Sequence, residues 1–309
     1  MNTLKGKIYL MLGFSLAGTS VITGYILSKS LKSFTITAVS LSILLLCLSP
    51  FYFGKTLKTV SILQKSDWKM LILQAVFGIF LFRVFLLLGV GLTTTAEAGI
   101  LTGITPALTS LLAFFFLKER FSSMTALGIF CTVFGIIMLQ GINLFSVKFS
   151  LDHFLGNMLI MCAAASESAF NVLSRKHKSS SDYTSFSIDP MVQTLLVSSI
   201  AFILSFPLAL WEHPFSTLQM IGLKEWLTLA WYGLIVTALA FFLFYQGVKH
   251  CSAYTTAAFS GMIPLVSMLL TFFFLKEEIV YTQWIGGLLI ISGMLLISKV
   301  PKKTIQISS

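Results

Sequence analysis

The chain has 309 residues, of which 56% are hydrophobic and only 10% are charged, and its mean hydropathy is +0.92. Soluble domains carry roughly 25% charged residues, so this chain lacks the polar side chains that would cover a soluble globule. Its formal net charge of +10 lies mainly in short segments between apolar stretches, where we expect it to face anionic lipid rather than a nucleic acid.

Ten apolar stretches approach the roughly 20 residues that a helix needs to cross a bilayer. They show no alternation of apolar and polar residues, which a transmembrane strand would require. The sequence therefore predicts an all-α polytopic membrane protein with ten transmembrane helices. In chain order, the predicted spans are Lys7–Ser28, Phe34–Phe53, Lys69–Val90, Ala96–Leu117, Ser123–Gly141, Phe154–Ser174, Pro190–Trp211, Glu225–Gly247, Tyr254–Leu275 and Tyr281–Ser298.

The positive residues predict how these spans are oriented. With the N-terminus in the cytoplasm, 15 of the 21 Lys and Arg residues fall on the cytoplasmic side, five fall on the opposite side and Arg83 lies inside a span. Cytoplasmic loops of membrane proteins carry an excess of positive charge. We therefore expect a multi-pass protein of the cell (plasma or inner) membrane with both N- and C-termini in the cytoplasm.

The third and fourth predicted spans hold the first candidate residues. Arg83 lies near the midplane, where a charge is costly unless it faces the bundle interior or water. We expect Arg83 either to attract an anionic or carboxylate group of a substrate, or to fix helix packing. In the second case it would pair with Glu97 of the fourth span or extend its side chain toward the membrane surface. Pro106, near the middle of the fourth span, predicts a kink that is either a hinge beside a cavity or a plain packing feature.

The sixth predicted span contains "SESAFN", the most polar stretch within any span. Glu167 lies at a depth similar to that of Arg83, so the two side chains could share one cavity. We predict that Glu167 binds a cationic group of the substrate or carries a coupling proton. Asn171 follows one turn later on the same face, where it would bind substrate or hydrogen-bond a neighbouring helix. Tyr232, in the eighth span, is a further candidate for substrate binding.

The heptapeptide "FFFLKER" of the fourth span recurs 158 residues later, in the ninth span, as "FFFLKEE". Shifting Phe80–Gly141 by 158 residues aligns it without a gap on Ala238–Lys299, and 15 of the 62 aligned residues are identical. The identities include four glycines, a Lys-Glu pair and a proline, so that Pro264 becomes a second kink candidate equivalent to Pro106. Apolar composition alone would not align these residues, which favours an internal duplication.

Each copy of the duplication would hold five spans, in residues 1–145 and 146–309. Because five is odd, the second copy would enter the membrane from the opposite face. The sequence therefore predicts two inverted five-helix repeats packed as one bundle, an arrangement that recurs in secondary transporters.

With ten spans in two halves and the paired stretches "GITPALTSLLAFFFLKER" and "GMIPLVSMLLTFFFLKEE", the chain resembles the EamA family of the drug/metabolite transporter superfamily over nearly its whole length. Lys118 and Lys276 stand where the family often has the glycine of a Leu-Gly-Glu ending. The resemblance implies a central cavity between the halves, cytoplasmic termini, and transport of a small metabolite, such as an amino acid or related compound, by alternating access.

The predicted function is secondary active transport, by an exporter or exchanger, and the alternative is a channel or facilitative pore for a small solute. An enzyme is not expected, because the spans offer neither a nucleophile with a base nor paired aspartates. The histidines and cysteines lack ligand spacing and no phosphate-binding loop occurs, so we expect no metal, cofactor or ATP. A proton or sodium gradient, or the gradient of the substrate itself, would supply the energy. The expected partners are a small-molecule substrate and the lipid bilayer, and the sequence indicates no oligomeric state.

Overall fold

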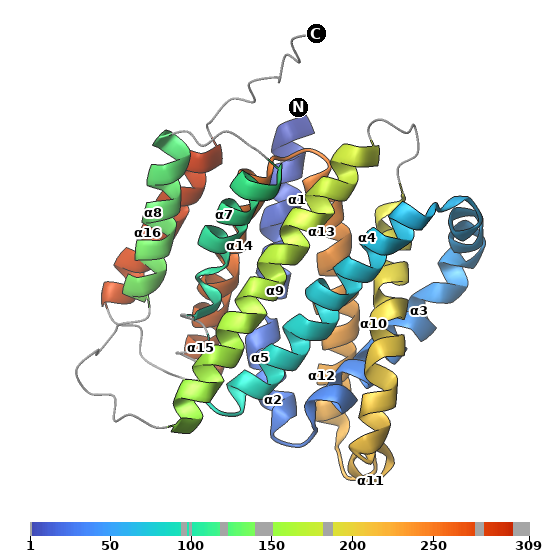
Figure 1. The fold of residues 1–309 in the computed structure, drawn as a ribbon. Coiled ribbons are helices and arrows are strands. Elements are labelled where there is room, and N and C mark those ends of the chain that lie inside the picture. Colours follow the sequence, from blue (N-terminus) through green and yellow to red (C-terminus); the bar gives the residue numbers. More distant parts are fainter. Residues whose placement is uncertain are drawn as a thin grey trace.

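The computed structural model describes residues 2–93, 98, 101–117, 123–139, 151–181, 188–275 and 281–298. These residues form helices, turns and short connections, and no strand occurs among them. The long helices pass up and down through one bundle, with α1 beginning and α16 ending on the same side (Figure 1). The predicted all-α class is therefore confirmed for the described residues.

The elements, in chain order, are α1 (Asn2–Ala17), α2 (Ser20–Ser28), α3 (Ser33–Ile62), α4 (Lys65–Ala75), the π-helix η1 (Val76–Leu81), α5 (Phe82–Val90), α7 (Thr105–Leu117), α8 (Ser123–Leu139), α9 (Leu151–Ser181), α10 (Pro190–Trp211), α11 (Pro214–Leu218), α12 (Leu223–Trp231), the π-helix η2 (Tyr232–Leu239), α13 (Ala240–Val248), α14 (Ala253–Ser260), α15 (Met262–Leu275) and α16 (Tyr281–Ser298). We call the side of the bundle on which α1 begins the N-terminal face.

Six helical stretches of the described residues are long and apolar enough to cross a membrane, so the chain is a multi-pass membrane protein. They are Thr3–Ser28, Ser33–Ile62, Lys65–Val90, Pro190–Trp211, Leu223–Val248 and Ala253–Phe274. Three shorter apolar stretches occur at Thr105–Leu117, Ser123–Gly135 and Trp284–Gly293. α9 is long enough, with 31 residues, but it contains more polar side chains. The count of ten spans stays a prediction.

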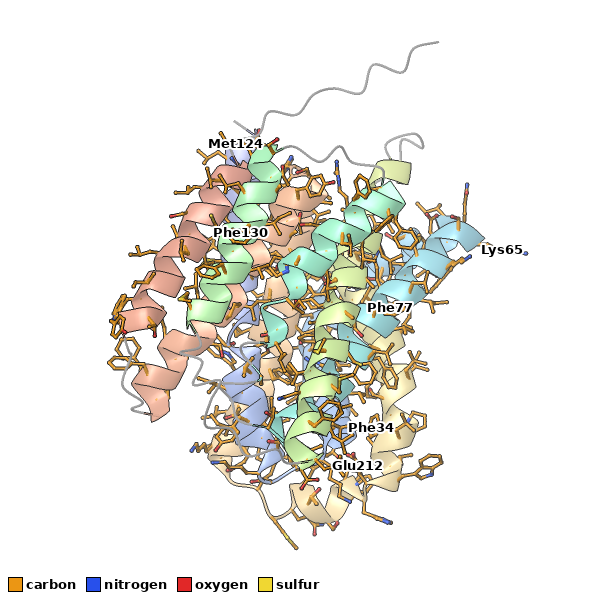
Figure 2. The ribbon with its side chains drawn as sticks, turned by 60° about the vertical axis from the view of Figure 1, so that its left-hand side comes forward. Phe34, Lys65, Phe77, Met124, Phe130 and Glu212 are labelled. Atoms are coloured by element: carbon orange, nitrogen blue, oxygen red, sulfur yellow. The ribbon has the colours of Figure 1, made fainter. Side chains whose placement is uncertain are left out.

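The outer faces of the bundle carry large apolar side chains, as a lipid environment requires. Phe130 and Met124 on α8, for example, are 65% and 56% exposed and project away from the other helices (Figure 2). Glu212, by contrast, turns inward at the end of α10. Its carboxylate accepts hydrogen bonds from the backbone N–H groups of Phe34, at 3.2 Å, and Thr35, at 2.7 Å. It thereby caps the first turn of α3, where a helix has unsatisfied N–H groups.

The first predicted span is interrupted in the structure. α1 and α2 are separated by Gly18 and Thr19, and the hydroxyl of Thr19 donates back to the carbonyl oxygen of Leu16 at 2.8 Å. A Cβ atom at Gly18 would lie only 2.8 Å from the carbonyl oxygen of Ile263 in the first turn of α15. Glycine therefore allows this interruption to contact the backbone of the ninth span.

The fourth and ninth predicted spans are interrupted just before their prolines. Gly103 and Ile104 form a turn before α7, and Gly261 separates α14 from α15. Pro106 and Pro264 consequently lie in the first turns of α7 and α15. At that position the missing N–H of a proline removes no intrahelical hydrogen bond.

Two π-helical segments occur at related positions of the third and eighth predicted spans. A shift of 158 residues moves η1, residues 76–81, onto residues 234–239, which lie inside η2. In a π-helix each hydrogen bond spans five residues instead of four, and such segments are frequent at functional sites. Both segments line the cavity described below.

Glycines bring α8 and α16 into close contact at one edge of the bundle (Figure 1). A Cβ atom at Gly135 would lie 2.7 Å from the carbonyl oxygen of Gly286, and one at Gly293 would lie 2.5 Å from that of Gly128. The shift of 158 residues converts Gly128 into Gly286 and Gly135 into Gly293, so it converts one contact into the other.

A second pair of glycine contacts joins the ends of four helices. A Cβ atom at Gly89 on α5 would lie 3.2 Å from the carbonyl oxygen of Gly156 on α9, and one at Gly247 on α13 would lie 3.0 Å from that of Gly6 on α1. Gly89 and Gly247 are again 158 residues apart. The third span thus packs on the sixth as the eighth packs on the first.

Candidate functional site

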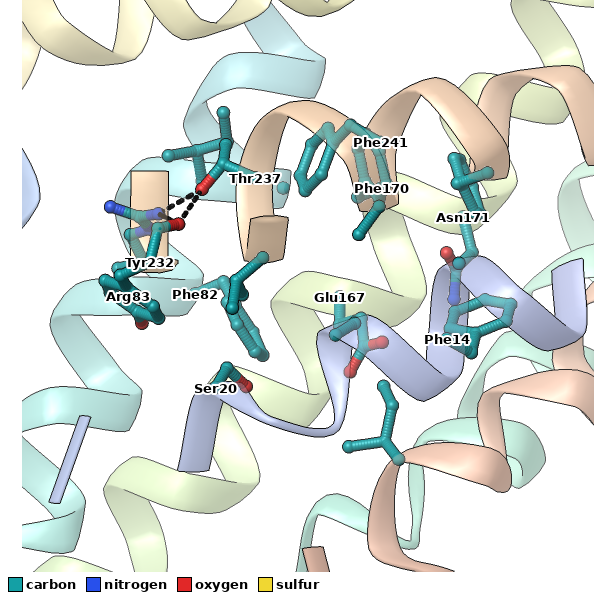
Figure 3. Close-up of a pocket in the computed structure, with 18 residues that line it drawn as sticks. Phe14, Ser20, Phe82, Arg83, Glu167, Phe170, Asn171, Tyr232, Thr237 and Phe241 are labelled. Atoms are coloured by element: carbon teal, nitrogen blue, oxygen red, sulfur yellow. Dashed lines mark hydrogen bonds between the residues drawn. The ribbon is translucent and has the colours of Figure 1, made fainter. Parts of the chain in front are cut away.

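A cavity lies inside the bundle between α1 and α2, η1 and α5, α9, and η2 and α13. Its lining includes all four binding candidates named from the sequence, which are Arg83, Glu167, Asn171 and Tyr232 (Figure 3). Arg83 and Tyr232 lie toward one end, Asn171 lies toward the other, and Glu167 lies between them. The cavity volume is about 60 Å³, which at about 30 Å³ for each water is space for roughly two waters.

Arg83 is held at its end of the cavity by neutral groups. One terminal nitrogen donates to the hydroxyl of Ser40 on α3 at 2.8 Å, and the other donates to the hydroxyl of Thr237 and to the carbonyl oxygen of Tyr232. The guanidinium carbon lies 4.1 Å from the centre of the Tyr232 ring, in cation–π contact. Glu97, the alternative partner considered above, lies outside the described residues.

The π-helical turn of η2 explains why two of these groups meet Arg83. The hydroxyl of Thr237 donates at 2.8 Å to the carbonyl oxygen of Tyr232, five residues earlier. In an α-helix, residues five apart point about 140° away from one another. The π-helical turn brings both toward the arginine, so the local backbone builds the arginine's surroundings.

Glu167 contacts the interruption of the fourth span. It is 9% exposed, and the hydroxyl of Thr105, the first residue of α7, donates to its carboxylate at 3.3 Å. The neighbouring Ser168 donates to the carbonyl oxygen of Thr105 at 3.2 Å. One turn further along α9, the Asn171 amide nitrogen donates to the hydroxyl of Thr109 at 3.5 Å. These contacts join α9 to α7 beside the cavity.

Two polar atoms of the lining have no hydrogen-bond partner among the described residues. They are the hydroxyl oxygen of Tyr232 and the amide oxygen of Asn171, and each residue is only 1% exposed. Buried polar groups are nearly always hydrogen-bonded in proteins. The Tyr232 hydroxyl can donate, and the Asn171 oxygen can accept, so each end of the cavity offers a distinct group for recognition.

Aromatic rings form the wall of the cavity toward the N-terminal face. Phe170 on α9 packs against Phe241, at 5.1 Å, and against Phe244, at 4.9 Å between ring centres, both on α13. Phe14 on α1 adds an edge-on contact to Phe244 at 5.7 Å. A Cβ atom at Gly78 of η1 would lie 2.7 Å from the Cγ atom of Phe170, so glycine leaves the space that this ring occupies.

Apolar clusters lie on both sides of the cavity. The cluster toward the N-terminal face is half aromatic and comprises Leu10, Phe14, Phe170, Phe244, Tyr245, Val248, Cys251 and Ile263. The cluster toward the opposite face is largely aliphatic and comprises Leu27, Leu31, Ile36, Leu87, Leu229, Tyr232 and Val236. The polar lining therefore lies between two apolar clusters, one toward each face of the bundle.

Arg83 and Glu167, whose similar depth in the spans suggested that they could share a cavity, both line this one. The hydroxyl partners Ser40, Thr105 and Thr237 were missed, because a neutral hydroxyl in an apolar span gives no comparable signal. Only Thr105 had a marker in the sequence, since it directly precedes Pro106. The two prolines themselves are not among the lining residues.

Comparison with known proteins gives consistent results. A family model described as the EamA-like transporter family matches residues 4–140 and again residues 154–299. The uncharacterized transporter YetK of Bacillus subtilis (strain 168) is 32% identical over 298 residues, covering 93% of this chain and 84% of YetK. The uncharacterized transporter YyaM of the same organism is 26% identical over 236 residues, covering 75% of this chain and 74% of YyaM. A solved crystal structure with 20% identity has a TM-score of 0.68, covers 96% of this chain and 95% of its own, and shares the fold.

Proposed function

Because this chain belongs to the EamA-like transporter family, we propose that it is a secondary active transporter that exports or exchanges a small metabolite, such as an amino acid or related compound, by alternating access. One observation carries the proposal. Arg83 and Glu167, from spans far apart in the sequence, line the same buried cavity. Ionisable side chains at this depth are expensive, and they mark substrate and ion pathways.

The lining suggests how a substrate is held. Arg83, with the hydroxyl of Tyr232 beside it, binds an anionic group such as a carboxylate. Glu167 binds a cationic group or carries a coupling proton, and the amide oxygen of Asn171 accepts a hydrogen bond from the same part of the substrate. The aromatic rings between these groups contact its apolar portion.

Three features support two inverted five-helix repeats, in residues 1–145 and 146–309. The family model matches once in each half. The π-helical segments are related by the shift of 158 residues that the sequence repeat defines. The glycine contacts between α8 and α16 are exchanged by that same shift, as a two-fold relation between the halves requires. Inverted repeats allow the two halves to exchange conformations, which moves access from one face of the membrane to the other.

The two proposed repeats have related helices and glycine contacts, but their charged residues do not lie at equivalent positions. The shift of 158 residues places Phe241 at the position of Arg83. The first and sixth spans align with a shift of 150 residues, from Gly6 to Gly156, which places Ala17 at the position of Glu167. Each charge of the cavity therefore occurs in only one half.

The position of the cavity favours a carrier over a channel, because apolar clusters lie on both of its sides. A screen of metabolites by thermal shift on the purified protein would identify ligands, and counterflow in proteoliposomes would test each one. We expect unlabelled solute on one side to accelerate the movement of labelled solute from the other. A rate that does not respond, and that rises linearly with concentration, would identify a pore instead.

The coupling role of Glu167 is tested by Glu167→Gln. We expect this variant to lose the dependence of transport on a pH gradient, since glutamine cannot exchange a proton. Thr194→Val, a buried change on α10 away from the cavity, is the matched control and should keep that dependence. If transport by Glu167→Gln still depended on the pH gradient, Glu167 would not be the carrier of a coupling proton.

The proposed location is the cell membrane, with both termini in the cytoplasm. A protease-cleavable tag on the N-terminus should be protected in intact cells and cut in inside-out vesicles. Cleavage in intact cells would reverse the proposed orientation.

A further inference from the structure

A line of buried polar side chains continues from the cavity between α7 and α9. Thr105 contacts Glu167 and Thr109 contacts Asn171, and in both pairs the residues are 62 positions apart. The two helices are therefore parallel and keep one register, with successive polar pairs one helical turn apart. Both helices run toward the N-terminal face (Figure 1). We call this line the α7–α9 seam, and it leads from Glu167 toward that face.

Two unpartnered polar atoms lie on the α9 side of the seam. Asn171 and Ser174 each have a side-chain oxygen without a hydrogen-bond partner among the described residues, and neither residue is more than 3% exposed. They follow Glu167 by four and seven residues, so all three share one face of α9. The seam thus offers two oxygens whose hydrogen-bonding capacity is not used by the described residues.

We propose that the α7–α9 seam conducts the coupling proton between Glu167 and the N-terminal face, an inference that rests on the proposed coupling role of Glu167. One helical turn measures about 5.4 Å, which is close to two hydrogen-bond lengths, so a single water between successive polar pairs completes a chain. Each hydroxyl or water oxygen accepts one proton and releases another. The Asn171 amide orients the waters without changing its own bonds.

The net transfer is balanced. At the N-terminal face a hydronium ion gives up one proton and becomes water. At the cavity the Glu167 carboxylate gains one proton and becomes a neutral carboxylic acid. When the cavity faces the other side of the membrane, the acid releases this proton to water there.

The charges around the seam favour a proton over a metal cation. Arg83 and Tyr232 are the ionisable side chains that share the cavity with Glu167, and the other helices contribute aromatic, aliphatic or hydroxyl groups to the lining. Arg175 lies on α9 beyond Ser174, where its guanidinium donates to the carbonyl oxygen of Val248 at 3.4 Å. A metal ion in the seam would lie between two arginines, whereas a relayed proton is neutralised on arrival at the carboxylate.

The test is infrared spectroscopy of the full-length protein reconstituted in lipid. The C=O stretch of the protonated Glu167 carboxyl is identified as the band that Glu167→Gln removes. On exchange of the buffer from H2O to D2O, the rate at which this band shifts reports how fast protons reach Glu167. We expect Thr109→Val and Asn171→Leu, which nearly preserve side-chain shape, to slow that rate about tenfold or more, because each removes a hydrogen-bonding group from the chain.

Two matched controls lie on α10, outside the seam. Thr194→Val removes an equally buried hydroxyl, and Ser198→Ala removes an equally unpartnered one, so both should exchange at the native rate. Ser174→Ala serves as a second seam variant if either of the larger changes lowers the folded yield. Native exchange rates in the folded seam variants would overturn the seam as the path. Failure to detect a Glu167 carboxyl band at any pH would instead overturn the coupling role itself, and the seam with it.

Discussion

The contacts of Arg83, at the end of the cavity, allow us to predict how much Arg83→Lys should lower the free energy of unfolding. In Arg83→Lys, one ammonium group replaces two terminal nitrogens that separately reach Ser40 on α3 and Thr237 on η2. A hydrogen bond from a charged donor contributes about 1.5–3 kcal/mol, and cation–π stacking on Tyr232 contributes about 0.5–2 kcal/mol. Because lysine retains part of each, we expect a loss of about 2–4 kcal/mol in the free energy of unfolding.

A double-mutant cycle isolates the contact with η2. We expect Arg83→Lys and Thr237→Val to be coupled by about 1.5–3 kcal/mol. Equilibrium unfolding in mixed micelles, titrated with sodium dodecyl sulfate and followed by tryptophan fluorescence, measures each variant. Arg83→Lys combined with Thr194→Val on α10 is the control, and those two changes should be additive. Additivity within about 0.5 kcal/mol in the Thr237 cycle would refute the assigned hydrogen bond.

The remaining predictions concern contacts that position the cavity, and thermal unfolding of the purified variants measures all of them. Gly293→Ala should destabilise by about 1–3 kcal/mol, because its Cβ atom would lie 2.5 Å from the carbonyl oxygen of Gly128 on α8. Gly54→Ala, where the added Cβ atom would have no atom within 4 Å, is its control and should stabilise α3 by up to about 1 kcal/mol. If both variants changed stability equally, the close α8–α16 contact would be contradicted. Glu212→Gln should cost about 1–2 kcal/mol, since an amide nitrogen cannot accept the hydrogen bonds that cap α3, and an unchanged melting temperature would argue against the cap. Gly78→Ala should displace Phe170 and lower both the stability of the protein and its affinity for ligand. An unchanged ligand affinity would show that the Phe170 ring does not contribute to the binding cavity.

Depth within an apolar span was the sequence signal that singled out Arg83 and Glu167 as candidates for a shared cavity. A charge in lipid must face the bundle interior, and two interior charges at one depth have few places to go except a shared cavity. Helical periodicity then added Asn171, one turn from Glu167. These inferences depend on the membrane and on helix geometry rather than on side-chain packing, so they can be made from sequence alone.

The helix interruptions and the π-helical segments could not be predicted from hydropathy or helical periodicity. Hydropathy does not distinguish "VFGIFL" as a π-helix from the same residues as an α-helix, because the composition is equal and only the backbone hydrogen-bond pattern differs. Gly18 gave no warning of a break, since glycine is also common within transmembrane helices. The partnership of Thr237 with Arg83 depends on a five-residue spacing that a period of 3.6 residues conceals.

Arg83 and Glu167 have no charged counterparts at the repeat-related positions, and this difference between the halves affects how a solute is oriented during transport. If both halves carried the same charges, a solute could bind equally well in two opposite orientations, and neither orientation would be preferred during transport. Here alanine and phenylalanine stand where the second glutamate and arginine would be. When the two halves exchange conformations, Arg83 and Glu167 keep their order along the cavity, so the solute should cross the membrane without reversing its orientation.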